Sequence, residues 1–398
     1  MIKLDILKEL PTVWEEIPLI RGKLHYISDY VKKADLLLLG LCILATAFGM
    51  VVIASATSHE GGNYLIIQGA ALILGIGLFV LFSLIDLDVL SGMWKILLAF
   101  SVVLILLLKP FGVEGNTGNK AWLRFGSIGV QPAEVVKIPF VILLSNLIVH
   151  MKNTRGINKP LSVVAAAGFT LALVGLIVAI SSDLGSGLVY VFIFIVLMYA
   201  AGLHILWIMF GVGAVTLMFP FLWNHFFSEY QKNRILAPYD PTVDPSGLGI
   251  TWQTNQSKNA ISGGGFLGQG LFKGNYTQSG GVTQQHTDFV FSAIGEELGF
   301  VGAMVVILLL TLIIVRCIRN GVRSHDPAGT LVCIGIGAML IFQTFENVGM
   351  CIGLTPVIGL TLPFISYGGS SIVVLYAAMG IVCGVRMRPK PSSFVTQY

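Results

Sequence analysis

Long apolar stretches recur along the chain, and short polar segments separate them. A helix that spans a membrane needs about 20 mostly apolar residues, and ten stretches approach that length. The pattern therefore predicts an all-α polytopic membrane protein with ten transmembrane helices. The expected spans are 36–56, 64–84, 89–108, 133–151, 161–181, 187–203, 206–223, 289–315, 329–353 and 366–385.

The amino-acid composition also indicates a membrane protein. Of the 398 residues, 55% are hydrophobic and 11% are charged, whereas a soluble domain carries about 25% charged residues. This excludes a soluble enzyme, a disordered chain and a disulfide scaffold, and the net charge of +4 is too small to indicate a nucleic-acid partner. The cysteines form no CxxC pair and lie in or beside apolar runs, so we expect buried free thiols. They are Cys42, Cys317, Cys333, Cys351 and Cys383.

Basic residues predict the orientation of the spans. Six Lys or Arg residues lie in 1–34, and three lie in each of 151–160, 316–325 and 386–390. With an even number of spans, these four segments fall on one side of the membrane, and their excess of basic residues marks that side as cytoplasmic. We therefore expect both termini in the cytoplasm.

The chain divides into a membrane domain, 35–388, and two cytoplasmic ends. Residues 1–34 mix apolar and charged side chains, which suits either a helix lying on the membrane surface or an ordinary polar tail; residues 389–398 form a short tail. An outer loop, 224–288, joins the seventh and eighth spans and is far longer than a usual connection, which predicts a functional segment. Within it, 263–268 matches GxGxxG without a preceding strand, so we expect tight backbone turns, or close approach to a bound glycan or phosphate, instead of a dinucleotide site.

Several ionisable residues lie in or next to the expected spans. A charge at the bilayer centre costs about 2.5–3.5 kcal/mol, so such residues are candidates for function. Glu134 and Lys137 are three positions apart on one helical face, where a structural ion pair and a functional pair are equally good interpretations. Glu346, deeper in its span, is expected to be a hydrogen-bonded packing residue. The remaining ones belong to the outer half of the membrane: Asp183, Asp288, Glu296 and Glu297.

The outer loops carry further basic and aromatic residues. Together with the carboxylates, they predict a cavity open to the outer leaflet, with basic groups at its rim. Basic groups suit a phosphate or pyrophosphate, and a carboxylate suits removal of a proton from a hydroxyl. For each basic residue taken singly, contact with solvent or a lipid headgroup is the alternative. The residues are Lys120, Trp122, Arg124, Lys232, Arg234 and Lys258.

The C-terminal region carries a recognisable motif. Residues 347–371, NVGMCIGLTPVIGLTLPFISYGGSS, resemble the signature of the SEDS family (shape, elongation, division and sporulation), which includes RodA and FtsW. Segments 118–137, 230–234 and 286–299 agree with the same family, and the similarity extends over 36–388. The family architecture, ten spans with a long loop after the seventh, matches the one predicted from the apolar pattern.

This resemblance implies a peptidoglycan glycosyltransferase of the bacterial cytoplasmic membrane. Its substrate would be lipid II, an undecaprenyl-pyrophosphate-linked disaccharide-pentapeptide, which the family polymerises into β-1,4 glycan strands on the outer face. The implied partner is a class B penicillin-binding transpeptidase. The family's catalytic aspartate corresponds to Asp288, and Trp122 corresponds to a residue important for activity. The other residues expected to bind substrate are Glu134, Lys137, Asp183, His286, Thr287, Ser366 and Tyr367.

The implied reaction converts an α-linked donor into a β-linked strand and so inverts the anomeric carbon. We hypothesise that Asp288 is the base for the acceptor GlcNAc 4-hydroxyl, with His286 as the alternative base. Burial beside Phe289 and Phe291 would raise the pKa of Asp288, whereas a nearby Lys or Arg would lower it. A divalent cation, Mg²⁺ or Mn²⁺, is a candidate cofactor. The predicted pyrophosphate contacts are Lys120, Arg124 and Arg234.

The sequence departs from the family pattern at two places. Residues 282–285, Val-Thr-Gln-Gln, stand where the family often has Pro-Glu, so either that glutamate is not part of the chemistry or another carboxylate shares its role. Residues 181–183 are Ser-Ser-Asp where the family has Gln-Pro-Asp, so only the aspartate is shared.

Two other classes of function are alternatives. A flippase for a lipid-linked sugar would suit a polytopic protein with internal charges, but the polar residues gather in the outer half and no inverted repeat is visible. A scaffold that only positions a partner gives no reason for Asp288. The short C-terminus, ending at Tyr398, and the simple loops favour the elongation member of the family over the division member.

Overall fold

Helices dominate the computed structural model, which describes residues 30–113, 120–126, 128–225 and 227–388. The predicted surface helix or tail within 1–29 and the tail 389–398 lie outside the described residues. The small sheet is antiparallel, in the order β1-β2-β3. The elements are α2 (Leu36–Ala56), α3 (Tyr64–Leu84), α4 (Leu87–Gly92), α5 (Trp94–Leu106), α6 (Leu108–Phe111), β1 (Gly112–Val113), β2 (Trp122–Phe125), β3 (Ile128–Val130), α7 (Pro132–Thr154), α8 (Pro160–Ser181), α9 (Leu184–Ala200), α10 (Ile205–His225), α11 (Glu229–Leu236), η1 (Pro241–Val243), α12 (Trp252–Gly264), α13 (Asn275–Gln278), α14 (Val290–Glu297), α15 (Gly299–Val322), α16 (Pro327–Cys351) and α17 (Gly369–Met387).

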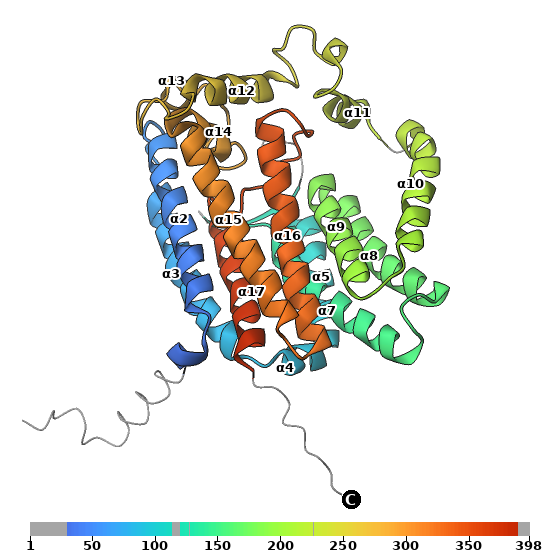
Figure 1. The fold of residues 1–398 in the computed structure, drawn as a ribbon. Coiled ribbons are helices and arrows are strands. Elements are labelled where there is room, and N and C mark those ends of the chain that lie inside the picture. The colour runs from blue at the N-terminus through green and yellow to red at the C-terminus, as the bar shows by residue number, and fades with distance from the viewer. Residues whose placement is uncertain (1–29, 114–119, 127, 226, 389–398) are drawn as a thin grey trace, which may run out of the picture.

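The prediction of an all-α polytopic membrane protein is confirmed. Within the described ranges, nine helices are long and apolar enough to cross a membrane, and α9 is a further apolar helix of 17 residues. The elements α11, α12 and α13 lie together at the end of the bundle opposite to the described chain ends (Figure 1). This arrangement places the long outer loop over the membrane domain.

Two predicted spans begin elsewhere in the structure. The third was expected at 89–108, but the Asp86 side chain accepts a hydrogen bond from Asp88 N and starts the short helix α4, so the span runs from Trp94. The eighth was expected at 289–315, but α14 ends at Glu297 and α15 starts at Gly299. Gly299 has φ +65°, a left-handed conformation that interrupts the helix at this point.

A buried ion cluster closes the end of the bundle where the described chain starts and finishes. Asp35 is fully buried and accepts hydrogen bonds from Arg316 at 2.8 and 2.9 Å and from Asn320 at 2.7 Å. Arg386 pairs with the same carboxylate at 2.8 Å. The start of α2 and the last turns of α15 and α17 therefore meet on one side of the membrane, as the distribution of basic residues predicted.

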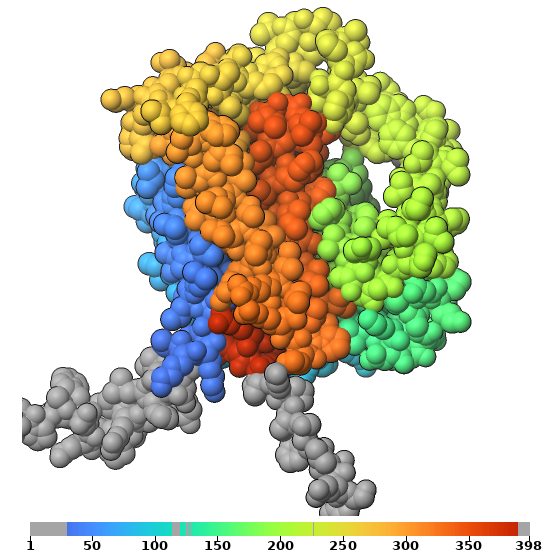
Figure 2. Space-filling view, in the orientation of Figure 1, coloured from blue at the N-terminus to red at the C-terminus, as the bar shows by residue number. Residues whose placement is uncertain are grey.

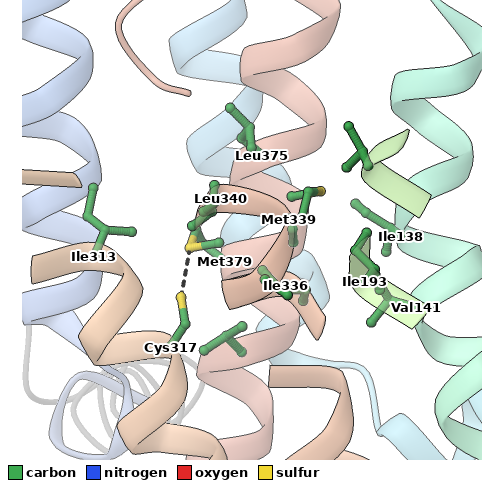
Figure 3. Close-up of a cluster of buried hydrophobic side chains, with 14 of the residues drawn as sticks. Ile138, Val141, Ile193, Ile313, Cys317, Ile336, Met339, Leu340, Leu375 and Met379 are labelled. Carbon is green, nitrogen blue, oxygen red and sulfur yellow. Dashed lines mark hydrogen bonds between the residues drawn. The ribbon is translucent and has the colours of Figure 1, made fainter. Parts of the chain in front are cut away.

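Tight packing joins the helices of the core. The backbones of α3 and α17 are so close that a Cβ at Gly380 would lie 2.5 Å from the Phe79 carbonyl oxygen. Sulfur atoms fill part of the apolar interior, where Cys317 Sγ lies 3.6 Å from Met379 Sδ (Figure 3). All five cysteines are free and buried, which confirms the prediction for them.

Helix α10 differs from every other span in its packing. None of its 21 residues, all of them described, is buried. In contrast, most residues of α7 are buried. Figure 2 shows an open space between the yellow-green α10–α11 region and the orange-red end of α16.

The glycine run 263–268 contains tight turns, one of its two predicted roles, with φ +55° at Gly265 and +82° at Gly268. It also makes close backbone contacts with α14, which the sequence analysis did not predict. A Cβ at Gly264 would lie 2.0 Å from the Gly295 carbonyl oxygen, and one at Gly268 would lie 2.2 Å from that of Glu297. The run therefore docks the end of α12 against α14, and larger side chains would separate the two.

Candidate functional site

The segment that carries Asp288 is held by the residues just before α17. The main-chain N–H of Tyr367 donates to the His286 carbonyl at 2.8 Å, and the Ser366 hydroxyl donates to the Thr287 carbonyl at 2.6 Å. Ser366 is itself buried and also accepts a hydrogen bond from Leu362 N. Ser366 and Tyr367 were expected to bind substrate; in the structure their described contacts hold the main chain of the candidate base.

The pKa of Asp288 answers the question that the sequence left open. Burial raises this pKa, the nearby Arg234 lowers it, Asp183 raises it, and the net result is a pKa of about 6. Both neighbouring aromatic residues, Phe289 and Phe291, are buried. Desolvation therefore outweighs the basic neighbour, and Asp288 is a stronger base than an ordinary aspartate.

Asp183 is a fixed carboxylate at the start of α9. It caps this helix by accepting hydrogen bonds from the Ser186 N–H at 2.9 Å and the Ser186 hydroxyl at 2.7 Å. The Gln131 amide donates to its second oxygen at 3.0 Å. Asp183 is thus close enough to Asp288 to influence it, while its own oxygens are engaged by protein groups.

Glu134 and Lys137 form a direct ion pair on α7, with the lysine fully buried. The Gln343 amide on α16 approaches the other Glu134 oxygen at 3.4 Å. One helical turn separates the partners, so the helix itself sets their distance. This contact agrees with the interpretation of Glu134 and Lys137 as a structural ion pair. A role of the two residues in binding substrate stays a prediction.

A cavity of about 660 Å³ lies between α11, α12 and the segment that follows α16. Its volume falls in the range of small-molecule sites, about 300–1,000 Å³. Arg234 and Lys258 bring two positive charges to its lining, and Gly353 and Val357 form part of the wall on the α16 side. The structure therefore places two of the predicted basic residues on one cavity.

Asp288 is not among the described residues that line this cavity, but it lies against the loop after α16 that forms part of the cavity wall. Gly359, two residues beyond the lining residue Val357, stands against the aspartate: a Cβ at Gly359 would lie 3.4 Å from Asp288 Oδ2. Arg234, which lines the cavity, is near enough to act on the pKa of Asp288. The Asp288 carboxylate is thus within electrostatic reach of a basic residue that lines the cavity, and a shared site for the two stays a prediction.

The sequence analysis missed Asp244, which organises the cavity wall. Its carboxylate accepts hydrogen bonds from the Thr251 hydroxyl at 2.7 Å, from Thr251 N at 3.0 Å and from Gly249 N at 2.9 Å. The Thr251 contacts lower the pKa of Asp244 to about 2. The Asp-Pro-Ser-Gly sequence at 244–247 is a turn signal that would have indicated this role.

His286 lies in an aromatic group beside the outer end of α3. Its ring centroid is 5.0 Å from that of Tyr64 and 5.8 Å from that of Tyr367, and its Nδ1 lies 3.7 Å from Glu60 Oε1. Burial lowers the pKa of His286, and the Glu60 charge opposes that shift. Among the described residues, the cavity lining does not include His286.

Three predicted residues lie on the hairpin between α6 and α7. Trp122 and Arg124 belong to β2, Lys120 precedes it, and Trp122 packs over Gly129 of β3. Strand β3 contacts α17. As far as the structure is described, none of the three lines the cavity, and Lys232 is paired instead with Glu229 at 2.7 Å.

Glu296, Glu297 and Glu346 serve structural contacts. Glu296 accepts hydrogen bonds from Tyr276 N at 2.7 Å and Thr277 N at 2.8 Å, and Glu297 accepts from the Ser55 hydroxyl at 2.7 Å. Glu346 lies close to the outer end of α16, not deep in its span as expected. Its main-chain carbonyl accepts a hydrogen bond from the Thr355 hydroxyl at 3.3 Å.

The side chains of the candidate site differ from those of a metal-binding site. No group of three or more His, Cys, Asp or Glu side chains in the described ranges is arranged to hold a metal ion. Asp183 is a carboxylate whose charge acts on Asp288, and both of its oxygens already accept hydrogen bonds. These side chains do not fit a cation held by the protein.

Comparison with known proteins finds relatives along nearly the whole chain. The sequence model of the cell cycle protein family FtsW/RodA/SpoVE matches residues 35–390. The probable peptidoglycan glycosyltransferase FtsW of Geobacter metallireducens is 34% identical, over 90% of this chain and 96% of the relative. The peptidoglycan glycosyltransferase MrdB of Escherichia coli is 31% identical, over 80% and 84%. A chain in a solved peptidoglycan synthase complex superimposes with a TM-score of 0.75 at 31% identity, over 89% of this chain and 97% of that chain.

Proposed function

The chain belongs to the SEDS family of FtsW, RodA and SpoVE, and from that premise we propose that it polymerises lipid II with Asp288 as general base. The protein is a peptidoglycan glycosyltransferase that crosses the cytoplasmic membrane several times. The observation that carries the proposal is the raised pKa of Asp288, about 6, at a carboxylate beside a cavity with two basic side chains.

In the proposed reaction, the acceptor 4-hydroxyl attacks the anomeric carbon of the donor sugar. The new carbon–oxygen bond forms as the bond to pyrophosphate breaks, which inverts the carbon in one displacement. The hydroxyl proton passes to Asp288, and the undecaprenyl pyrophosphate leaves with the electron pair of the broken bond. At pH 7 a carboxylate of pKa about 6 is mostly ionised and yet accepts a proton more readily than an ordinary aspartate.

The basic residues of the site are assigned to the leaving group. Arg234 and Lys258 line the cavity and would stabilise the charge that develops on pyrophosphate. Lys120 and Arg124 on the hairpin remain proposed outer contacts for the same group. The described carboxylates do not fit a divalent cation, so no step of the proposed reaction uses one that the protein holds. The predicted cation would instead arrive bound to the pyrophosphate.

The proposed partner is a class B penicillin-binding transpeptidase, supported by the similarity to a chain of a peptidoglycan synthase complex. Relatives named for division and for sporulation match alongside MrdB. The proposal of a role in elongation rests on the simple loops of this chain. Complementation of strains depleted of either activity would decide between the two roles.

The test of the function is polymerisation of lipid II by the purified full-length chain in detergent. Asp288→Asn keeps the shape of the side chain and removes the base, so we expect glycan synthesis to fall at least 100-fold. The matched control is Asp240→Asn, an aspartate of the outer loop that contacts Thr242 and is not among the described lining residues. Near-normal synthesis by Asp288→Asn would overturn the assignment of the base.

The same assay separates the enzyme from a flippase. Detergent micelles offer no membrane to cross, so a protein that only moves lipid II would give no strands under these conditions. Absence of synthesis by the unchanged chain, alone and with the transpeptidase added, would favour the flippase.

A further inference from the structure

One buried amide joins the segment that carries Asp288 to the segment that faces its carboxylate. The Asn347 Nδ2 group donates two hydrogen bonds, to the Asp288 carbonyl and to the Leu360 carbonyl, each at 2.7 Å. Leu360 directly follows Gly359, the residue against the Asp288 carboxylate. Asn347 is fully buried in α16, which packs against α7, α9 and α15.

We propose that Asn347 is a positioning residue, which fixes the candidate base and the opposing loop at a set separation through their main-chain carbonyls. The proposal rests on the function assigned to Asp288 above. It gives the asparagine at the start of the 347–371 motif a physical task in the reaction.

Asn347 completes a row of three held carbonyls. Tyr367 N binds the carbonyl of His286, the Ser366 hydroxyl binds that of Thr287, and Asn347 binds that of Asp288. Each peptide group in this stretch is therefore tied to the rest of the fold. A main chain held at three successive residues leaves the Asp288 side chain only its own two torsions, and a displacement of about 1 Å at a reacting group can cost 100-fold in rate.

Packing alone does not explain an asparagine here. Within the described part of the chain, Asn347 Oδ1 is buried without a hydrogen-bond partner, a condition that costs stability. Leucine has the same branching of side-chain heavy atoms, although it is larger, and would avoid that cost. The two donated hydrogen bonds are what leucine cannot supply, and both go to segments that meet at the Asp288 carboxylate.

The first variant to test is Asn347→Leu in the full-length chain. We expect kcat for lipid II polymerisation to fall 10- to 100-fold, with KM changed less than threefold, because the base is misplaced while the cavity is kept. Loss of the two donated hydrogen bonds also lets the two segments separate and admits water to Asp288, so the acid limb of the pH profile should move below pH 6. The control is Thr344→Val, a change of the same kind on the same helix, which removes a hydroxyl with no described partner.

A second pair of variants covers the case in which Asn347→Leu does not fold. Ser366→Ala removes the donor to the Thr287 carbonyl and should lower kcat, and Ser366→Thr should restore it by returning a hydroxyl. Folded Asn347→Leu or Ser366→Ala protein with normal kcat and an unmoved pH profile would overturn the proposal. So would a loss explained entirely by a smaller folded fraction. If these variants are normal while Asp288→Asn is inactive, only the positioning role fails; if Asp288→Asn is active, the proposed function itself fails.

Discussion

Gly359 lies directly against the carboxylate of Asp288. A Cβ on the glycine would stand 3.4 Å from Oδ2 of the aspartate, which is van der Waals contact, and Gly359 has φ +73°. The left-handed backbone therefore favours glycine at this position.

Gly359→Ala is expected to lower polymerisation by about tenfold or more. The positive φ adds about 1 kcal/mol of strain for a residue with a Cβ, and relief of that strain would shift the loop whose new methyl group touches the carboxylate. The measurement is kcat with purified protein and lipid II. Gly168→Ala is the control, because this α8 glycine has ordinary backbone and open space around its Cβ position; equal activities of the two variants would contradict the prediction.

Activity should depend on the ionisation of Asp288. A base with a pKa of about 6 must lose its proton to work, so kcat/KM should fall tenfold for each pH unit below about 6. The check is a pH profile between about pH 3.5 and 8. An acid limb near pH 4, the ordinary position for aspartate, would show that burial does not control the base.

Asp288→Asn should make the fold more stable at neutral pH. The folded chain raises this pKa from 3.8 to about 6, so the unfolded chain releases the proton more readily. Ionised Asp288 therefore costs stability that grows from about pH 4 to pH 6 and then stays constant, at most about 3 kcal/mol for a two-unit shift. Thermal unfolding at pH 5 and 7.5 tests this; a lower melting temperature for the variant at pH 7.5 would disagree.

Lys137→Met should destabilise the membrane domain. It leaves the buried Glu134 carboxylate without its cation, with only the 3.4 Å Gln343 contact remaining. Removing one partner of a buried pair costs about 3–5 kcal/mol. The double variant Glu134→Gln, Lys137→Met removes both charges and should recover most of the loss in a thermal unfolding assay. If the double variant were no better than the single one, charge would not be the cause.

The apolar pattern predicted most spans because lipid-facing helices need long apolar runs. It misplaced the start of the eighth because Glu296 and Glu297 are satisfied by groups far away in the sequence, including Ser55. The left-handed conformation of Gly299, which separates α15 from α14, also cannot be predicted from hydropathy. Amino-acid sequence alone does not distinguish a carboxylate that accepts hydrogen bonds from distant residues from one that is catalytic.

The sequence singled out Asp288 and Arg234, and the structure brings the charge of Arg234 within reach of the Asp288 carboxylate, while the roles of both stay predictions. These residues stood out because ionised side chains near the membrane are costly. Asn347 carries no charge, and its importance depends on two carbonyls, one 13 and one 59 residues away. Only the folded arrangement shows such contacts, so sequence reasoning gave it no role.

The Asp35 cluster has a consequence for biosynthesis. Arg316 follows Asp35 by 281 residues, and at about 5–20 residues per second that distance takes on the order of 15–60 s to translate. Throughout this interval the Asp35 carboxylate at the start of α2 lacks the arginines that bind it in the folded protein. Chains that stop before Arg316 would keep the carboxylate without these partners, as a mark of incomplete assembly.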